Sequence, residues 1–188
     1  MISEVYRKGR DAKEASYVLQ TAGTDVKNKA LAYIADALMA HSDAILSANA
    51  EDLKRAKEKG MAPAMVDRLT LTKERISAMA EGVRQVIDLR DPSGIVLDEF
   101  TRPNGLAIKK VSVPLGVIAI IFESRPNVTV DAAALCIKAG NACVLRGGSE
   151  AIASNTALTS VIRQGLKAAG LPENSVNIIE NTDRALVK

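Results

Sequence analysis

The chain has 188 residues, of which 47% are hydrophobic and only 3% aromatic, so we expect one core of Ala, Val, Ile and Leu with a small appendage. The 25 basic and 22 acidic residues are spread along the chain without a basic stripe interleaved with aromatics, which argues against nucleic-acid binding. No apolar run reaches membrane-spanning length, the charged N-terminus lacks a signal-peptide pattern, and two cysteines without an export signal favour a reducing cytoplasm.

The first half of the chain has the apolar periodicity of amphipathic helices. Val5 begins the apolar stripe of the first segment, and Val26 begins that of the second. Gly23 ends the first helix, Thr24 is expected to cap the second, and Thr72 is expected to cap the last. The predicted helices cover residues 3–22, 25 to about 47, 48–59, 63–69 and 73–89.

A β-hairpin is predicted after these helices. Asp91 to Gly94 form a turn, and residues 95–101 and 106–113 read as strands joined by Pro103-Asn104-Gly105. We expect this hairpin to stand apart from the main sheet.

The last part of the chain predicts a β-α-β unit and its continuation. The apolar, β-branched run 117–122 is typical of a strand that is buried on both faces in a parallel sheet. Pro126 suits the start of a helix, which ends at Gly140-Asn141. The elements that follow are a strand at 142–145, a helix at 151–169, a strand at 176–179 and the start of a helix at 182–188.

The predicted fold is therefore α/β: N-terminal helices, a hairpin, and then a parallel Rossmann-like sheet with helices on both faces. We divide the chain into residues 1–94 (helical), 95–113 (hairpin) and 114–188 (start of the sheet). Polar groups cluster at the carboxyl ends of the strands, the edge where open α/β sheets bind ligands.

Neither cysteine has the setting of a nucleophile. Cys136 falls in mid-helix and Cys143 in mid-strand, each between apolar neighbours and without a nearby histidine to lower its pKa. His41, the sole histidine, is expected on the polar side of a surface helix. We therefore predict buried structural cysteines, no metal site and no histidine-based triad.

Two loops carry the candidate site residues. Arg146-Gly147-Gly148-Ser149-Glu150 suits a ligand because glycines admit close approach and arginine offers a fork of donors for phosphate, although Gly-Gly-Ser also occurs in ordinary turns. Asn127, at a helix start, is placed either to stabilise an anion or simply to cap the helix. Arg125 is placed either to bind a substrate anion or to form a surface salt bridge.

Several motifs together resemble a known family. They are D-R-L at 67–69, D-P-S-G at 91–94, N-G-L at 104–106, E-S-R-P-N-V at 123–128, K-A-G-N at 138–141 and V-L-R-G-G-S-E-A at 144–151. Over almost its whole length the chain resembles the γ-glutamyl phosphate reductase branch of the aldehyde dehydrogenase superfamily. It has neither the Pro-Trp-Asn nor the Lys-Pro-Ser-Glu loop of the wider superfamily.

The resemblance implies NADPH-dependent reduction of L-glutamyl 5-phosphate to L-glutamate 5-semialdehyde in proline biosynthesis. It implies that Arg146 holds the ribose 2′-phosphate of NADPH within the loop 146–150, and that Glu150 orients the ribose. Asn127 would donate its amide to an oxyanion, and Arg125 would meet the acyl phosphate or the substrate carboxylate.

The resemblance further implies a nucleophilic cysteine and a second domain beyond Lys188, so we expect this chain to be the N-terminal, inactive part of the enzyme. The hairpin would bridge subunits of a homo-oligomer, and glutamate 5-kinase is a candidate partner. The alternatives are another acylating aldehyde dehydrogenase and a non-catalytic dinucleotide-binding module.

Overall fold

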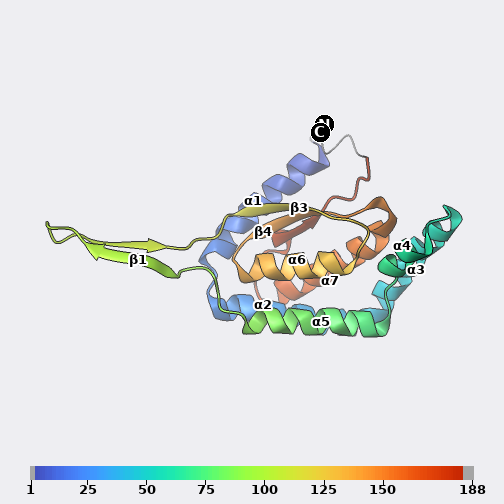
Figure 1. Ribbon diagram of the computed structural model, residues 1–188, viewed down its shortest axis with the longest axis horizontal. Helices are drawn as coiled ribbons and strands as arrows, with labels where there is room; N and C mark the ends of the chain where they lie inside the picture. Colours follow the sequence, from blue (N-terminus) through green and yellow to red (C-terminus); the bar gives the residue numbers. More distant parts are fainter. Residues whose placement is uncertain (1–2, 184–188) are drawn as a thin grey trace.

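The computed structural model describes residues 3–183. Figure 1 shows a layered α/β body from which a two-stranded hairpin projects. The elements are α1 Glu4–Thr21, α2 Thr24–Ala40, α3 Ser42–Glu58, α4 Pro63–Leu69, α5 Lys73–Asp88, β1 Val96–Thr101, β2 Ala107–Val111, β3 Val117–Ile121, α6 Asn127–Lys138, β4 Ala142–Arg146, α7 Ile152–Ala168 and β5 Val176–Ile178.

Strands β3, β4 and β5 form a parallel sheet in that order, and β4 lies at its centre. Helix α1 packs on one face of the sheet, and α6 and α7 pack on the other (Figure 1). The predicted fold class is confirmed. The predicted burial of 117–122 on both faces is wrong within the described residues, because β3 is the edge strand there and Ile121 is 66% exposed.

A second helical layer, formed by α2 and α5, lies beneath α6 and α7 (Figure 1). Gly165 on α7 allows α2 to approach, because a Cβ there would meet the backbone nitrogen of Ile34 at 2.8 Å. Leu158, Ile162, Leu38 and Val83 fill the space between the layers and are almost fully buried. Each such side chain contributes about 1.5–3 kcal/mol of hydrophobic stabilisation, so the packing of α2 and α5 stabilises α6 and α7 in their places against the sheet.

The predicted helix from 25 to about 47 is interrupted at His41. Helix α2 ends at Ala40, α3 begins at Ser42, and the intervening His41 is an exposed turn residue and not part of a helix. Neither Gly nor Pro marks this break in the sequence. Its physical reason is tertiary: the change of direction lets α2 and α3 each pack against α7. The predicted start and end of α4 at Pro63 and Leu69 are confirmed, as is the start of α5 at Lys73, where Thr72 caps the helix.

The start of α2 also differs from the prediction. Gly23 is the N-cap, and the hydroxyl of Thr24 donates instead to Asp91 at 2.7 Å. Val26 is 39% exposed, whereas Lys27 is buried and forms an ion pair with Asp91 at 2.6 Å. Val5, likewise predicted on an apolar stripe, is 37% exposed. At the start of α2 the buried ion pair takes the place that apolar patterning assigned to Val26, whereas Ala30, Ile34 and Leu38 further along the same helix are buried.

The hairpin is separate from the three-stranded sheet, as predicted. Strands β1 and β2 pair antiparallel, and Glu99 and Lys109 face each other in an ion pair of 3.0 Å. Gly105, at the tip, has a φ of 84°, a conformation that favours glycine. Every residue of β1 is exposed, including Val96 and Phe100. Its role in bridging subunits, and the three-part division of the chain, stay predictions.

Both cysteines are buried and unpaired, as predicted. They neighbour each other, because α6 packs on β4, and a hydrogen bond between the thiols together with burial raises the pKa of Cys143. Of the helix predicted at 182–188, residues 184–188 lie outside the described residues, and Thr182 and Asp183 belong to no helix. Among residues 3–183, no helix is both long enough and apolar enough to cross a membrane.

Candidate functional site

The loop 146–150 lies at the carboxyl end of β4 and lines a cavity of about 270 Å³. All five predicted cofactor residues line it, together with Ile121, Phe122 and Thr182. Parallel pairing of β3 with β4 places Ile121 opposite Arg146, so the loops after both strands open at the same edge. The cavity thus lies where open α/β sheets bind ligands.

The two glycines of this loop are required by packing within the chain. A Cβ on Gly147 would meet Nδ2 of Asn155 at 2.2 Å, and a Cβ on Gly148 would meet Oγ of Ser124 at 2.2 Å. Both contacts are far closer than real Cβ atoms tolerate. Neither glycine has a positive φ. The glycines therefore let Asn155 and Ser124 of the protein approach the loop backbone. Sequence reasoning had expected the glycines to admit a ligand instead.

Arg146 and Glu150 lie at opposite ends of the loop. The guanidinium of Arg146 donates to the backbone oxygen of Asp183 at 2.8 Å and lies at the cavity surface. The carboxylate of Glu150 accepts hydrogen bonds from Ser124 at 2.7 Å and Ser149 at 3.1 Å. The Ser124 hydrogen bond is the main reason why the pKa of Glu150 is lowered. The loop thus presents a cation at one end and a fixed anion at the other.

The amino end of α7, which follows this loop, is filled from within the chain. The buried carboxylate of Asp52 on α3 accepts hydrogen bonds from the backbone N–H groups of Ala153, at 3.2 Å, and Ser154, at 2.7 Å. In many α/β proteins these helix-end groups bind a pyrophosphate. Asp52 occupies that position here, so the residues present fit the phosphate of a cofactor at Arg146 and not at the α7 amino end.

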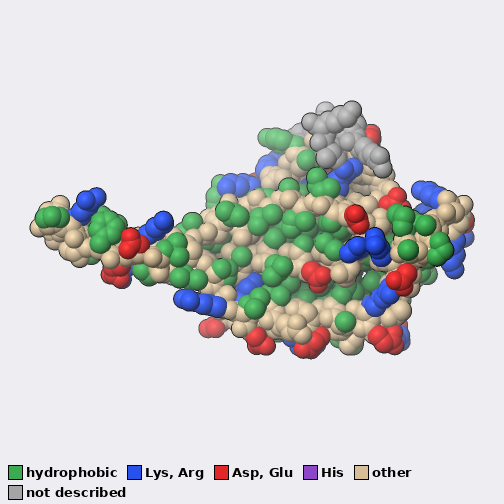
Figure 2. All heavy atoms as spheres, viewed as in Figure 1, with side chains coloured by type: hydrophobic (Ala, Val, Ile, Leu, Met, Phe, Trp, Pro, Cys, Tyr) green, Lys and Arg blue, Asp and Glu red, His purple; other side chains and the backbone are tan. Residues whose placement is uncertain are grey.

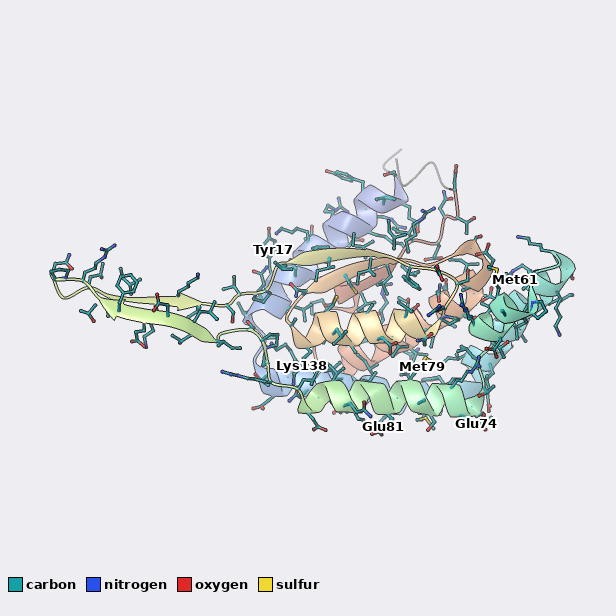
Figure 3. The ribbon with its side chains drawn as sticks, viewed as in Figure 1. Tyr17, Met61, Glu74, Met79, Glu81 and Lys138 are labelled. Carbon is teal, nitrogen blue, oxygen red and sulfur yellow. The ribbon has the colours of Figure 1, made fainter. Side chains whose placement is uncertain are left out.

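Arg125 and Asn127 line a larger cavity of about 480 Å³ between α4, α5 and α6. Met79 of α5, labelled in Figure 3, lies beneath α6 and contributes to the lining. The charged side chains around this cavity are Asp67, Arg68, Arg75, Arg125 and Asp131. Figure 2 shows basic and acidic side chains gathered at the end of the body beside α4. A site of mixed charge suits a small polar ligand that carries both signs of charge.

A third cavity, of about 340 Å³, lies between the other two. It shares Gly148 and Glu150 with the cavity at the loop 146–150, and Arg68 and Arg125 with the cavity between α4, α5 and α6. The predicted cofactor loop and the predicted substrate residues therefore border one connected surface.

The geometry also bears on the roles considered for Asn127 and Arg125. Asn127 is the first residue of α6, and its side chain donates to Asp131 at 3.2 Å and does not cap the helix. The nearest carboxylate to Arg125 is that of Glu123, at 3.9 Å, and such an exposed and distant pair contributes little to stability. Their parts in catalysis and substrate binding stay predictions.

Sequence reasoning did not select Arg68 or Asp131 as site residues. Asp131 lies four positions after Asn127 in α6, and this spacing, which places both on one helix face, could have found it. Arg68 belongs to the D-R-L motif but comes from a helix distant in sequence, and only the folded chain brings it to the cavity. Asp52 gave no signal as a site residue, because the groups of α7 that it binds are more than one hundred residues away.

Comparison with known proteins places the chain. The model of the aldehyde dehydrogenase family matches residues 3–188. The chain belongs to the aldehyde dehydrogenase family. Within this family it is 55% identical over 184 residues to a γ-glutamyl phosphate reductase from Moorella thermoacetica. The aligned region covers 98% of this chain and 44% of that protein.

Solved structures agree with this similarity. The crystal structure of a γ-glutamyl phosphate reductase from Thermotoga maritima superposes with a TM-score of 0.97 at 48% identity, covering 98% of this chain and 45% of that one. The corresponding Saccharomyces cerevisiae structure gives a TM-score of 0.90 at 34% identity, covering 100% and 49%. The resemblance to the reductase branch is confirmed, and the chain spans less than half the length of these relatives.

Proposed function

We propose that the protein containing this chain reduces L-glutamyl 5-phosphate to L-glutamate 5-semialdehyde with NADPH, a step of proline biosynthesis. The observation that carries the proposal is the connected surface between the loop 146–150 and the residues Arg125 and Asn127. This surface supports the proposal because Arg146 and Arg125, on separate parts of it, could each bind an anionic group. The similarity to γ-glutamyl phosphate reductases supports the substrate and the pathway.

NADPH is the proposed cofactor because Arg146 offers a guanidinium at the cavity surface. A planar fork of donors suits the 2′-phosphate that distinguishes NADPH from NADH. Glu150, fixed by Ser124, is proposed to accept a hydrogen bond from the ribose. When bound, the cofactor supplies a hydride.

The proposed reaction is covalent. A cysteine thiolate attacks the acyl carbon, a C–S bond forms, and the C–O bond to phosphate breaks, which releases inorganic phosphate. The thioester carbon would accept the hydride supplied by a cofactor held at Arg146 and Glu150, and departure of the thiolate would leave the aldehyde. Asn127 is proposed to donate its amide to the oxygen that carries the developing negative charge. Because Cys136 and Cys143 are buried, the thiolate is proposed to come from outside this chain.

Three further features belong to the same proposal. The exposed apolar residues of the hairpin, among them Val96, Phe100 and Leu106, are proposed to bridge subunits of a homo-oligomer. Glutamate 5-kinase is a proposed partner, because its product would be the labile acyl phosphate consumed here. The cytoplasm is the proposed location.

The test is an assay of the complete gene product with NADPH and L-glutamyl 5-phosphate. The expected result is oxidation of one NADPH for each phosphate released. Activity with an acyl-CoA thioester and none with the acyl phosphate would instead identify another acylating aldehyde dehydrogenase. Binding of NADPH without turnover of either substrate would identify a dinucleotide-binding module.

A further inference from the structure

The cavity of about 480 Å³ between α4, α5 and α6 contains charges that the protein does not neutralise. Among its charged residues, Asp67 and Arg75 form an ion pair at 2.9 Å, and Arg75 also donates to the backbone oxygen of Thr70 at 2.7 Å. These two side chains therefore neutralise each other and stabilise the turn between α4 and α5. The other charged residues that line this cavity are Arg68, Arg125 and Asp131.

Arg68 is the least engaged of the three. Within residues 3–183 its guanidinium makes no ion pair or hydrogen bond, although it lines both this cavity and the neighbouring one of about 340 Å³. Arg125 lines the same two cavities, and the nearest carboxylate, that of Glu123, is 3.9 Å away. Two guanidinium groups thus border one space, and each has donors free for an anion.

The backbone on either side of Arg68 is fixed. On one side, Arg75 holds the backbone oxygen and the carboxylate of Asp67. On the other side, the buried side chain of Asn49 donates to the backbone oxygen of Leu69 at 2.9 Å and accepts from the N–H of Leu71 at 2.8 Å. Arg68 therefore extends from a short helix that is held in place on both sides, which is the support that a binding residue needs.

Asp131 supplies the opposite charge. In the part of the chain that the structure describes, its only hydrogen-bond partner is the side-chain amide of Asn127, at 3.2 Å, and it has no cationic partner. Burial of its carboxyl group raises its pKa despite this hydrogen bond. Asp131 is an exposed residue that lines the cavity, so its carboxylate is open to a cationic ligand there.

We propose that this cavity recognises the amino-acid head group of the substrate, with Asp131 binding its ammonium group and Arg68 binding its α-carboxylate. The proposal deepens the proposed function and rests on it. The charges correspond group by group: L-glutamyl 5-phosphate carries two anionic groups and one ammonium, and the cavity offers two guanidinium groups and one carboxylate. Within residues 3–183, Arg68 and Asp131 have no counter-ion, and Arg125 has only the distant carboxylate of Glu123. Arg125 then takes the phosphate.

The test compares two substrates that differ only in the amino group, L-glutamyl 5-phosphate and glutaryl phosphate, with the complete gene product. Asp131→Asn is expected to lower kcat/KM for L-glutamyl 5-phosphate by about 10- to 100-fold more than for glutaryl phosphate, mainly through KM, because any effect that passes through Asn127 falls on both substrates alike. Arg68→Ala is expected to lower kcat/KM for both substrates by about 10- to 100-fold, because both keep the anionic group that it binds.

Matched controls are Asp43→Asn and Arg84→Ala, which remove exposed charges of the same kind outside the cavity. Both controls should leave both substrates unchanged. Arg68→Lys should recover only part of the loss, because a lysine cannot reproduce a two-pronged contact.

The proposal is overturned if wild-type protein does not discriminate between the two substrates, if Asp131→Asn lowers both equally, or if Arg68→Ala lowers neither. If wild-type protein reduces neither acyl phosphate, the proposed function fails, and the head-group site is judged by calorimetry with L-glutamate and glutarate. Tighter binding of L-glutamate, lost in Asp131→Asn, supports the site, and equal or absent binding of the two overturns it.

Discussion

The hydroxyl of Ser124 donates a hydrogen bond of 2.7 Å to Glu150, across the loops that follow β3 and β4. The two residues are 26 positions apart, and each lies in a motif that the sequence analysis selected independently. Parallel pairing of β3 and β4 brings both loops to one edge, and the absence of a side chain on Gly148 lets Ser124 reach the second loop. The hydrogen bond therefore joins the predicted substrate loop to the predicted cofactor loop.

Replacing Ser124 with Ala should raise the pKa of Glu150, because this hydrogen bond is the main influence that lowers it. An acid whose pKa is lowered by folding contributes stability above its unfolded-state pKa and loses it as the pH falls through the folded value. The part of the stability that depends on Glu150 should therefore shrink in Ser124→Ala. Carboxyl resonances followed by NMR during a pH titration measure the pKa directly, and Ser149→Ala should give a smaller rise. An unchanged pKa in Ser124→Ala would contradict this account.

Replacing Gly148 with Ala should destabilise the protein by about 1–3 kcal/mol, as overpacking does, because the new Cβ would overlap Ser124 and Glu150. Gly82 on α5 is the matched control: a Cβ there meets nothing within 4 Å, and Ala in a helix is favoured over Gly by about 0.5–1 kcal/mol. Thermal denaturation should therefore show a lower midpoint for Gly148→Ala and an equal or higher one for Gly82→Ala. A midpoint for Gly148→Ala at or above that of wild type would show that the loop is loosely packed.

Replacing Asp91 with Asn should cost about 3–5 kcal/mol at neutral pH, because Lys27 would be left buried without its counter-charge. Burial acts to raise the pKa of Asp91, but hydrogen bonds from Lys27, Thr24 and the N–H of Ser93 outweigh it, and the pKa is lowered. The carboxylate thus stabilises the fold above the ordinary pKa of aspartate, and this contribution is lost as the pH falls below it.

The stability difference between wild type and Asp91→Asn should accordingly shrink on acidification, which denaturant titrations at neutral and acidic pH would measure. The double variant Lys27→Met with Asp91→Asn should recover part of the loss. A difference that does not change with pH would mean that Asp91 carries no shifted pKa.

Local signals in the sequence predicted a large part of this fold. Pro63 and Thr72 mark the starts of α4 and α5, and Gly105 marks the hairpin tip, because each acts through its own backbone geometry or capping group. The apolar runs predicted β3, β4 and β5 within one or two residues. Local signals also identified residues 146–150 as one loop.

Long-range contacts account for what could not be predicted. The break at His41 depends on how α2 and α3 meet α7, and Lys27 is buried only because Asp91, far along the chain, faces it. Arg68 reaches the cavity of Arg125 and Asn127 only through the packing of α4. In each case one partner lies dozens of residues away, so neither periodicity nor capping reports it.

Neither cysteine should react with a thiol reagent in the folded protein, because Cys143 is fully buried with a raised pKa and Cys136 is 6% exposed. The 188-residue chain on its own should accordingly show no NADPH oxidation with L-glutamyl 5-phosphate. Both thiols should react once the chain is unfolded, which serves as the control. Activity of the purified chain that disappears in Cys136→Ser or Cys143→Ser would overturn the assignment of both as structural.

The cofactor assignment depends on the position of Arg146 at the carboxyl end of β4. A charge-assisted contact with a phosphate contributes roughly 1.5–3 kcal/mol, and a contact with a neutral ribose contributes less. Glu150→Gln, by contrast, should affect NADPH and NADH similarly, because its carboxylate is proposed to contact the ribose that both share. A selective effect of Glu150→Gln on NADPH would place this carboxylate beside the 2′-phosphate.

The most direct measurement is therefore the Kd of NADPH and of NADH for wild type and Arg146→Ala of the complete gene product, with Arg84→Ala as the control. The account predicts that Arg146→Ala weakens NADPH binding by about 10- to 100-fold and NADH binding much less, since each factor of ten corresponds to about 1.4 kcal/mol. The loss should shrink at high salt, because part of it is Coulombic. Equal weakening of both cofactors, or no change in either, would contradict the assignment of Arg146 to the 2′-phosphate.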